Sequence, residues 1–230
     1  MSDGVRRPAS RWDGEYRRLG PIWGDGPSEL IRETMPLLQR EARRDSRLTV
    51  LDIGCGYGRD AALLASRLPV RVLAVDPSRV GIEMARRRLP AGAEVEFRPA
   101  GFVDIGDAEG PFDVIVVAAL YHLLEPPQRT GLRAVVEERL APEGLFLLST
   151  LSVNDPQHAG SGAPVAGEEN SFLERVYLHL STEGELRRDF GFLEVVELRE
   201  VVAEERRSDG VVHDHLWWVL AARRRRGCQA

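Results

Sequence analysis

Lysine is absent from this chain of 230 residues, so its 31 basic residues are all arginines. We attribute this to the base composition of the genome, because no physical mechanism requires lysine to be avoided at every surface position. The formal net charge is −5, so the charge balance gives no indication of a nucleic-acid partner. The basic run at 223–226 is typical of a solvated chain end rather than of a binding arm.

Cysteines and long apolar runs are also scarce. The only two cysteines, Cys55 and Cys228, exclude a disulfide framework. No apolar run approaches the roughly 18 residues needed to cross a bilayer, and the first residues lack the apolar core of a signal peptide. We therefore expect a cytoplasmic protein without a membrane partner. A P-loop is excluded as well, because the pattern G-x-x-x-x-G-K-S/T does not occur.

The most informative segment has the sequence LTVLDIGCGYGRD and begins at residue 48. A short apolar run leads into three glycines at alternate positions, Gly54, Gly56 and Gly58, and the alanine- and leucine-rich residues that follow predict a helix. Strand, glycine turn and helix form the unit that lets a nucleotide-like ligand lie against bare backbone. A second apolar run ends in Asp76, where an acid can accept hydrogen bonds from ribose hydroxyls. The chain is therefore predicted to bind an adenosine-containing cofactor.

The spacing of the glycines distinguishes between such cofactors. A dinucleotide fingerprint, G-x-G-x-x-G, needs its third glycine where this chain has Arg59. The acid before the first glycine, Asp52, would repel a pyrophosphate, but it suits a cation such as a sulfonium that carries an amino group. The segment resembles motif I of the class I S-adenosylmethionine-dependent methyltransferases, and residues 72–78 resemble their second motif.

This resemblance implies both the fold and the cofactor site. The implied fold is α/β, with a doubly wound, mostly parallel, Rossmann-like sheet of seven strands in the order 3-2-1-4-5-7-6, the last strand antiparallel. The implied cofactor is S-adenosylmethionine. Its methionine part and ribose are expected to contact Asp52, Gly54, Cys55, Gly56, Gly58, Asp60, Asp76 and Pro77. The backbone near Gly101 and Phe102 is expected to face the adenine, and Ala118 and Tyr16 are expected to complete the site.

The order of predicted elements agrees with this fold independently. Strands are expected at 50–53, 71–75, 94–97, 112–118 and 145–150, helices at 59–67, 79–88, 128–140 and 182–190, and a hairpin of 192–202 with 212–221. Before them, residues 12–26 are expected to form a loop, and Ser28 is expected to cap a helix that is bent or interrupted at Pro36.

We expect a single domain over residues 1–230. Within it, residues 1–27 are expected to form a lid-like segment and residues 223–230 a frayed tail. Residues 151–180 leave the carboxyl end of a parallel strand, where α/β sheets bind ligands, and are predicted to form a lid on the substrate side.

Histidines are the candidate catalytic residues. His213 and His215 are two apart on a predicted strand, so both point to one face, and His179 follows the lid. Tyr121 and His122 come after the fourth strand, where cofactor and substrate should meet. These side chains could act as a base, as an anion-binding cluster or as a metal site, or the histidines could lie on a polar surface; we assign no metal.

The signature N/D-P-P-Y/F does not follow the fourth strand, which makes methylation of nucleic acids and amides less favourable. The segments around Tyr16, 27–30, 184–190 and 204–210 look like the tellurite-resistance methyltransferases, which are similar to small-molecule thiol methyltransferases. That family uses a histidine–arginine pair on the last hairpin, where this chain has Arg206 and Arg207, and either arginine could hold an anionic substrate.

We therefore predict methyl transfer to a small molecule, with a thiol, selenium or tellurium acceptor preferred. Transfer to oxygen or nitrogen of a small metabolite, with His213 or His215 as base, is the alternative enzyme. The alternative that is not an enzyme is a module that binds S-adenosylmethionine without catalysing a reaction. The protein is expected to be a monomer or a homodimer, and Trp12, Tyr16 and Trp23 could close over the cofactor or bury an interface.

Overall fold

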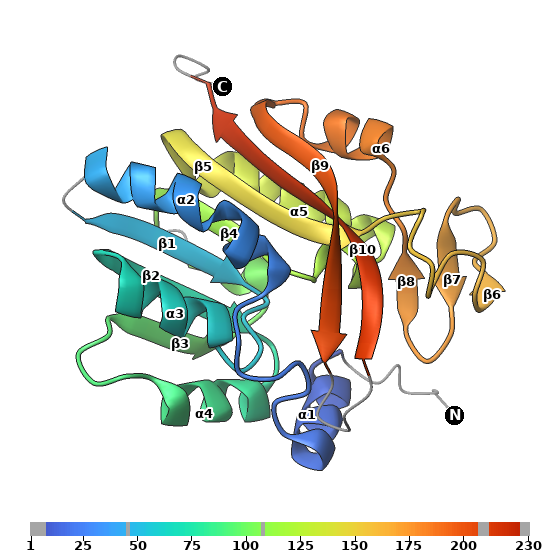
Figure 1. The fold of residues 1–230 in the computed structure, drawn as a ribbon, viewed down its shortest axis with the longest axis horizontal. Coiled ribbons are helices and arrows are strands. Elements are labelled where there is room, and N and C mark those ends of the chain that lie inside the picture. Colours follow the sequence, from blue (N-terminus) through green and yellow to red (C-terminus); the bar gives the residue numbers. More distant parts are fainter. Residues whose placement is uncertain (1–7, 45–46, 107–108, 207–211, 226–230) are drawn as a thin grey trace.

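Seven strands form one sheet with helices on both faces (Figure 1). The computed structural model describes residues 8–44, 47–106, 109–206 and 212–225. The strands of this sheet are β1 (Leu48–Ile53), β2 (Val70–Asp76), β3 (Val95–Pro99), β4 (Phe112–Val117), β5 (Leu140–Leu151), β9 (Leu193–Arg206) and β10 (Val212–Arg224). Their order in space is β3-β2-β1-β4-β5-β10-β9.

The predicted order 3-2-1-4-5-7-6 is confirmed, because β9 and β10 are the sixth and seventh strands of this sheet along the chain. β1 to β5 are mutually parallel, and β10 runs antiparallel to both of its neighbours. Three short strands between β5 and β9 form a second sheet in the order β6-β7-β8, which the sequence did not predict. They are β6 (Ala163–Pro164), β7 (Ser171–Leu173) and β8 (Tyr177–His179).

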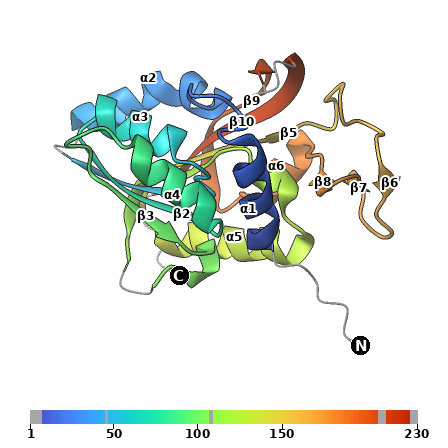
Figure 2. The same cartoon turned by 90° about the horizontal axis from the view of Figure 1, so that it is seen from below.

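Helices cover the main sheet on both faces, so strands such as β1, β2 and β4 contribute to two hydrophobic cores. One face packs against α2 (Glu29–Arg44), α3 (Arg59–Arg67) and α4 (Arg79–Arg88), and the other against α5 (Pro126–Arg139) and α6 (Glu183–Asp189). Figure 2 shows α2 and α3 on the side of the sheet opposite α5. Successive strand residues alternate between these cores: Val50 packs with α2 and α3, whereas Leu51 faces α5 and α6.

The N-terminal segment differs from its prediction. The sequence predicts a loop at 12–26, but α1 (Pro8–Leu19) is helical through Leu19 and turns follow it. Trp12 and Tyr16 lie four residues apart, so they share one side of the helix and pack with Trp23 and Tyr57. Burial of this aromatic side outweighs the low helix propensity of Gly14, so a helix forms where the sequence pattern predicts a loop.

The helix that follows agrees with its prediction in part. Oγ of Ser28 accepts a hydrogen bond of 3.3 Å from the backbone N–H of Ile31, as expected for an N-cap. α2 then continues to Arg44 with Pro36 inside it, so of the two predicted alternatives, a bend or an interruption, the interruption does not occur.

The lid and the chain end are partly ordered into strands. Residues 151–180 leave the end of β5 and pass through β6, β7 and β8 before α6 (Figure 1). At the other end, Arg223 belongs to β10 and donates a hydrogen bond of 2.8 Å to Glu41, so regular structure extends into the expected tail. Cys228 and Arg207 lie outside the described residues, as does the side chain of Arg206. No helix in the described ranges is long and apolar enough to cross a membrane.

Candidate active site

A cavity of about 630 Å³ opens at the carboxyl ends of the parallel strands. Its walls come from the N-terminal segment, the glycine turn after β1, the end of β2, the residues after β4, the lid, and the hairpin of β9 and β10. This is the edge at which open α/β sheets bind ligands, because the chain reverses direction there and leaves a crevice. The cavity is large enough for a cofactor together with part of a small substrate.

The glycine turn and the acid after β2 form one hydrogen-bonded unit. The N–H groups of Gly54 and Cys55 donate to the carbonyl oxygen of Val75, at 2.8 and 3.1 Å. The N–H of Gly56 donates to Oδ2 of Asp76 at 2.9 Å, and Oδ1 of Asp76 accepts from the N–H of Ser78 at 2.7 Å. The carboxylate of Asp76 therefore holds the turn while it lines the cavity.

Buried carboxyl groups make this end of the cavity acidic. Burial raises the pKa of Asp76 to about 6. Burial, followed by the charges of Asp60 and Asp76, raises the pKa of Asp52 well above its ordinary value. Burial also raises the pKa of Glu29, although Glu29 accepts a hydrogen bond of 2.5 Å from Ser149.

Such an environment fits a cationic ligand better than an anionic one. Oδ2 of Asp52 is buried and accepts no hydrogen bond within the described part of the chain. A ligand that carries a sulfonium and an ammonium group would offset the repulsion among these carboxyl groups and supply donors to them. The residues present are therefore suited to the methionine part of S-adenosylmethionine.

Aromatic rings from the N-terminal segment cover the glycine turn. The ring centroids of Tyr16 and Tyr57 are 5.9 Å apart, and those of Trp23 and Tyr57 are 6.3 Å apart. A Cβ atom on Gly56, whose φ is 55°, would lie 2.7 Å from the phenolic oxygen of Tyr16. Only glycine allows this close approach, so the turn and its aromatic cover depend on each other.

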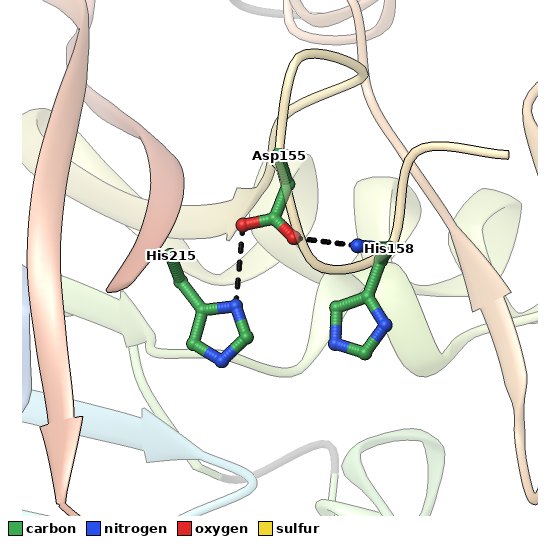
Figure 3. Close-up of side chains that lie close together, drawn as sticks. All are labelled: Asp155, His158 and His215. Atoms are coloured by element: carbon green, nitrogen blue, oxygen red, sulfur yellow. Dashed lines mark hydrogen bonds and ion pairs between the residues drawn. The ribbon is translucent and has the colours of Figure 1, made fainter. Parts of the chain in front are cut away.

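Three histidines, His122, His158 and His215, form another part of the cavity wall, called the histidine wall below, and Asp155 lies behind them. Nδ1 of His215 lies 3.2 Å from Oδ2 of Asp155, and the other carboxylate oxygen accepts the backbone N–H of His158 at 2.9 Å (Figure 3). The rings of His158 and His215 are nearly parallel, with centroids 5.4 Å apart. His122 lies edge-on to Trp217, with a centroid distance of 5.5 Å.

The structure brings ten of the predicted site residues to the cavity wall. These residues are Tyr16, Asp52, Gly54, Cys55, Gly56, Asp60, Asp76, Ala118, His122 and His215. The other seven predicted residues do not line it: Gly58, Pro77, Gly101, Phe102, Tyr121, His179 and His213.

Packing explains several of these placements. A Cβ on Gly58 would lie 2.7 Å from Ala85 and Phe97, so this glycine permits close packing of α3 on its neighbours. Tyr121 is buried in the core on the α5 side and donates a hydrogen bond of 2.6 Å to Asp189. His179 is held between Ser171 at 2.9 Å and Glu185 at 2.8 Å, so it does not join His213 and His215, whose ring centroids are 6.0 Å apart.

Three residues that line the cavity, Glu29, His158 and Trp217, are not among the predicted site residues, and neither is Asp155, which binds His215. Asp155 and His158 belong to the lid, whose path sequence patterns do not define, although an acid and a histidine three apart in a turn were a usable signal. Glu29 and Trp217 were read as parts of ordinary elements, and only the fold shows that both line the cavity.

Comparisons with known proteins agree with this fold. Residues 50–144 match the family described as "Methyltransferase domain". The cyclopropane-fatty-acyl-phospholipid synthase of Escherichia coli K12 is 36% identical over 104 residues, which cover 45% of this chain and 26% of the relative. The O-methyltransferase cnsE of Penicillium expansum is 30% identical over 158 residues, which cover 66% of this chain and 55% of the relative. The chain thus corresponds to between about a quarter and about half of these two relatives.

Solved structures show the same architecture. A SAM-dependent methyltransferase from Methanosarcina mazei has a TM-score of 0.69 at 24% identity, with 83% of this chain and 97% of that chain covered. TehB from Haemophilus influenzae has a TM-score of 0.62 at 17% identity, with 83% of this chain and 62% of that chain covered. Likeness at this identity shows the fold alone, so the tellurite-resistance assignment rests on the sequence resemblance only. The sheet order, the glycine turn and the match of residues 50–144 to a methyltransferase domain agree with a Rossmann-like methyltransferase fold, the fold of the solved structures compared.

Proposed function

We propose that this protein transfers the methyl group of S-adenosylmethionine to an oxygen atom of a small molecule by in-line displacement. One observation carries the proposal: a single cavity joins the acidic glycine turn to the histidine wall. The sulfonium already activates the leaving group, so the protein has to orient the two reactants, exclude water and accept a proton.

The proposed cofactor site follows the residues of the acidic end. Asp52, Gly54, Gly56 and Asp60 would surround the methionine part, with Cys55 and Ala118 beside it and Tyr16 above the turn. Asp76 would accept hydrogen bonds from the ribose hydroxyls. Gly101 and Phe102 are proposed to lie next to the adenine, since the N–H of Ala100, just before them, donates to the backbone carbonyl of Asp76 at 3.1 Å.

Oxygen is favoured as the acceptor atom by two independent features. The relative from Penicillium expansum is an O-methyltransferase, and so is the ubiquinone biosynthesis O-methyltransferase of Methylocella silvestris, which is 30% identical over 161 residues. A carboxylate-bound histidine on the acceptor side is useful for a hydroxyl, which must lose a proton. A thiol, selenium or tellurium acceptor is the second candidate, favoured by the resemblance to the tellurite-resistance group, and it needs no base.

Isothermal titration with S-adenosylmethionine tests the proposal first. We expect micromolar binding by the intact protein, loss of binding in Asp76→Ala, and unchanged binding in Glu83→Gln, which alters an exposed acid on α4. Turnover is then followed as S-adenosylhomocysteine release with phenols, aliphatic alcohols, thiols, selenite and tellurite. Absence of binding by the folded protein would reject the proposal, and binding without turnover of any probe would favour a non-catalytic module.

A further inference from the structure

We propose that His215, oriented by Asp155, is the base that takes the proton from a neutral phenol or enol acceptor, with His122 as a neutral hydrogen-bond partner of that acceptor. This inference rests on the proposed function and adds the residue roles and the substrate class.

The carboxylate of Asp155 is fully buried, and four hydrogen bonds to its two oxygens hold it in one position. Oδ2 accepts from the N–H of Leu216 at 2.7 Å and from Nδ1 of His215 at 3.2 Å. Oδ1 accepts the N–H groups of Gln157 and His158, at 3.1 and 2.9 Å.

The charge state of Asp155 follows from these contacts. Burial alone would raise the pKa of Asp155, but hydrogen bonds from His215 and Leu216 outweigh it and hold the pKa below its ordinary value. Asp155 is thus ionised at neutral pH.

The carboxylate fixes the tautomer of His215. An ionised carboxylate only accepts hydrogen bonds, so Nδ1 of His215 must carry a proton, and the lone pair of the neutral ring is then on Nε2. The ring is 3% exposed and belongs to the cavity wall. It is held between the rings of His158 and Trp217, at centroid distances of 5.4 and 6.0 Å.

His122 supplies an independent sign of a ligand. It lines the same cavity, is 6% exposed, and its Nδ1 has no hydrogen-bond partner among the described groups. A buried polar atom without a partner is costly, and a substrate atom would satisfy it. Burial, and then the neighbouring histidines, lowers the pKa of His122 to about 3, so the ring stays neutral. A neutral ring offers no charge to hold a carboxylate or phosphate, which favours a neutral hydroxyl.

The same residues could also be considered as a metal site. Asp155, His158 and His215 offer ligand atoms that all lie within 4.8 Å of one another. However, N–H donors already occupy both acceptor positions of each Asp155 oxygen. An ion could bind this carboxylate only by displacing a hydrogen bond, so the arrangement favours a base.

The proposed step transfers one methyl group to the acceptor and one proton to the protein. As the acceptor oxygen attacks the methyl carbon, the O–C bond forms and the S–C bond breaks, and the electron pair of that bond stays on sulfur. The hydroxyl proton moves to Nε2 of His215. The products are a methyl ether, S-adenosylhomocysteine and an imidazolium ion beside Asp155, which later releases its proton to water.

The test compares the intact protein with His215→Gln and Asp155→Asn, with Asp214→Asn as the matched control. Asp214 is an exposed carboxylate next to His215 on β10 and lies outside the cavity wall. Probes are phenol and the more acidic 4-nitrophenol. With phenol, His215→Gln is expected to lose about 10²- to 10⁴-fold in rate, and much less with 4-nitrophenol, which ionises without help. The affinity for S-adenosylmethionine should not change.

Asp155→Asn tests whether Asp155 acts through His215. In this variant the imidazolium of His215 would lose its carboxylate partner, so the acidic limb of the pH–rate profile should move to lower pH. The titratable groups around His215 are Asp155, His158 and His122, together with His213 on the same strand. The pH–rate profile is therefore also recorded for His122→Phe, to separate the effect of this neighbour from that of Asp155. Asp214→Asn should leave the profile in place.

Two results would overturn the proposal while the proposed function stands. One is a His215→Gln variant that binds the cofactor and turns over phenol within about threefold of the intact rate. The other is stoichiometric binding of Zn²⁺ that is lost in His215→Gln and in His158→Gln. If neither phenol is methylated, ¹⁵N spectra of the histidine rings decide: a proton on Nδ1 of His215 that is lost in Asp155→Asn supports the proposal, and a proton on Nε2 overturns it.

Discussion

The backbone N–H of Gly56 donates a hydrogen bond of 2.9 Å to the carboxylate of Asp76, which joins the turn after β1 to the end of β2. The glycine motif and the acid are twenty residues apart in the chain but act as one unit. Asp76 therefore has two roles, holding the turn and facing the proposed ribose site. Any change of its charge should affect the cofactor site as a whole.

The affinity for S-adenosylmethionine should depend on pH through Asp76. Burial raises the pKa of Asp76 to about 6, and the ribose hydroxyls require the ionised form. The dissociation constant is therefore expected to be constant above neutral pH and to rise as the pH falls through about 6. Titration calorimetry from about pH 5 to about pH 8, a range of roughly three units around this pKa, measures the change.

Asp76→Asn is the matching variant, because the amide can still accept from Gly56 or Ser78 but cannot ionise. At high pH its affinity should be lower by about 10- to 100-fold, the effect of losing charged hydrogen bonds of roughly 1.5–3 kcal/mol. Its affinity should no longer change near pH 6. An unaltered pH dependence in this variant would show that another group is responsible.

Gly58 should matter for stability rather than for binding. Its φ is 75°, and a Cβ there would clash with Ala85 and Phe97 at 2.7 Å. Gly92 has a similar φ of 81° but open space around it. Gly92→Ala should therefore cost about 1–2 kcal/mol through backbone strain, and Gly58→Ala clearly more through the added overpacking. Urea unfolding of both variants measures the difference, and equal losses would contradict the packing role.

His122 should make the protein sensitive to acid. Burial lowers its pKa to about 3, whereas the unfolded chain has the ordinary value near 6.5. The unfolded state therefore binds the extra proton between these values, so stability is complete above about 6.5 and is lost as the pH falls, by at most about 1.4 kcal/mol per pH unit. His122→Phe cannot take up this proton and should unfold at lower pH than the intact protein in an acid titration followed by circular dichroism.

Tyr57 should control how tightly the N-terminal segment covers the glycine turn. Its hydroxyl donates to the carbonyl of Gly24 at 2.8 Å and accepts the N–H of Trp23 at 3.1 Å. Tyr57→Phe removes both hydrogen bonds, at a cost of about 1 kcal/mol, and should speed the release of the cofactor several-fold. Stopped-flow tryptophan fluorescence measures the release, and Tyr177→Phe in the lid is the control. An unchanged release rate would mean that the segment does not close the cofactor site.

Local patterns predicted α3, α4 and the glycine turn well because each pattern covers a short stretch of sequence. The bounds of α3 and α4 agree with the predicted ranges 59–67 and 79–88, and Asp52, Gly54, Gly56 and Asp76 all line the cavity. Each of these residues lies at the end of a strand, and the ends of parallel strands must meet at one edge. α1 was missed because its helix depends on aromatic packing against distant Tyr57 rather than on its own propensity.

The sequence by itself determined the α/β class, since apolar periodicity is a local property. Its resemblance to the class I S-adenosylmethionine-dependent methyltransferases implied the order of the main sheet and the cofactor. Tertiary structure alone decided the histidine arrangement on the proposed acceptor side. Whether His215 meets Asp155 and His158 or His179 depends on the path of residues 151–180, and no local pattern defines that path. The lid folds back so that Asp155 accepts the N–H of Leu216 on β10, and this contact over sixty-one positions selects which histidines face the cavity.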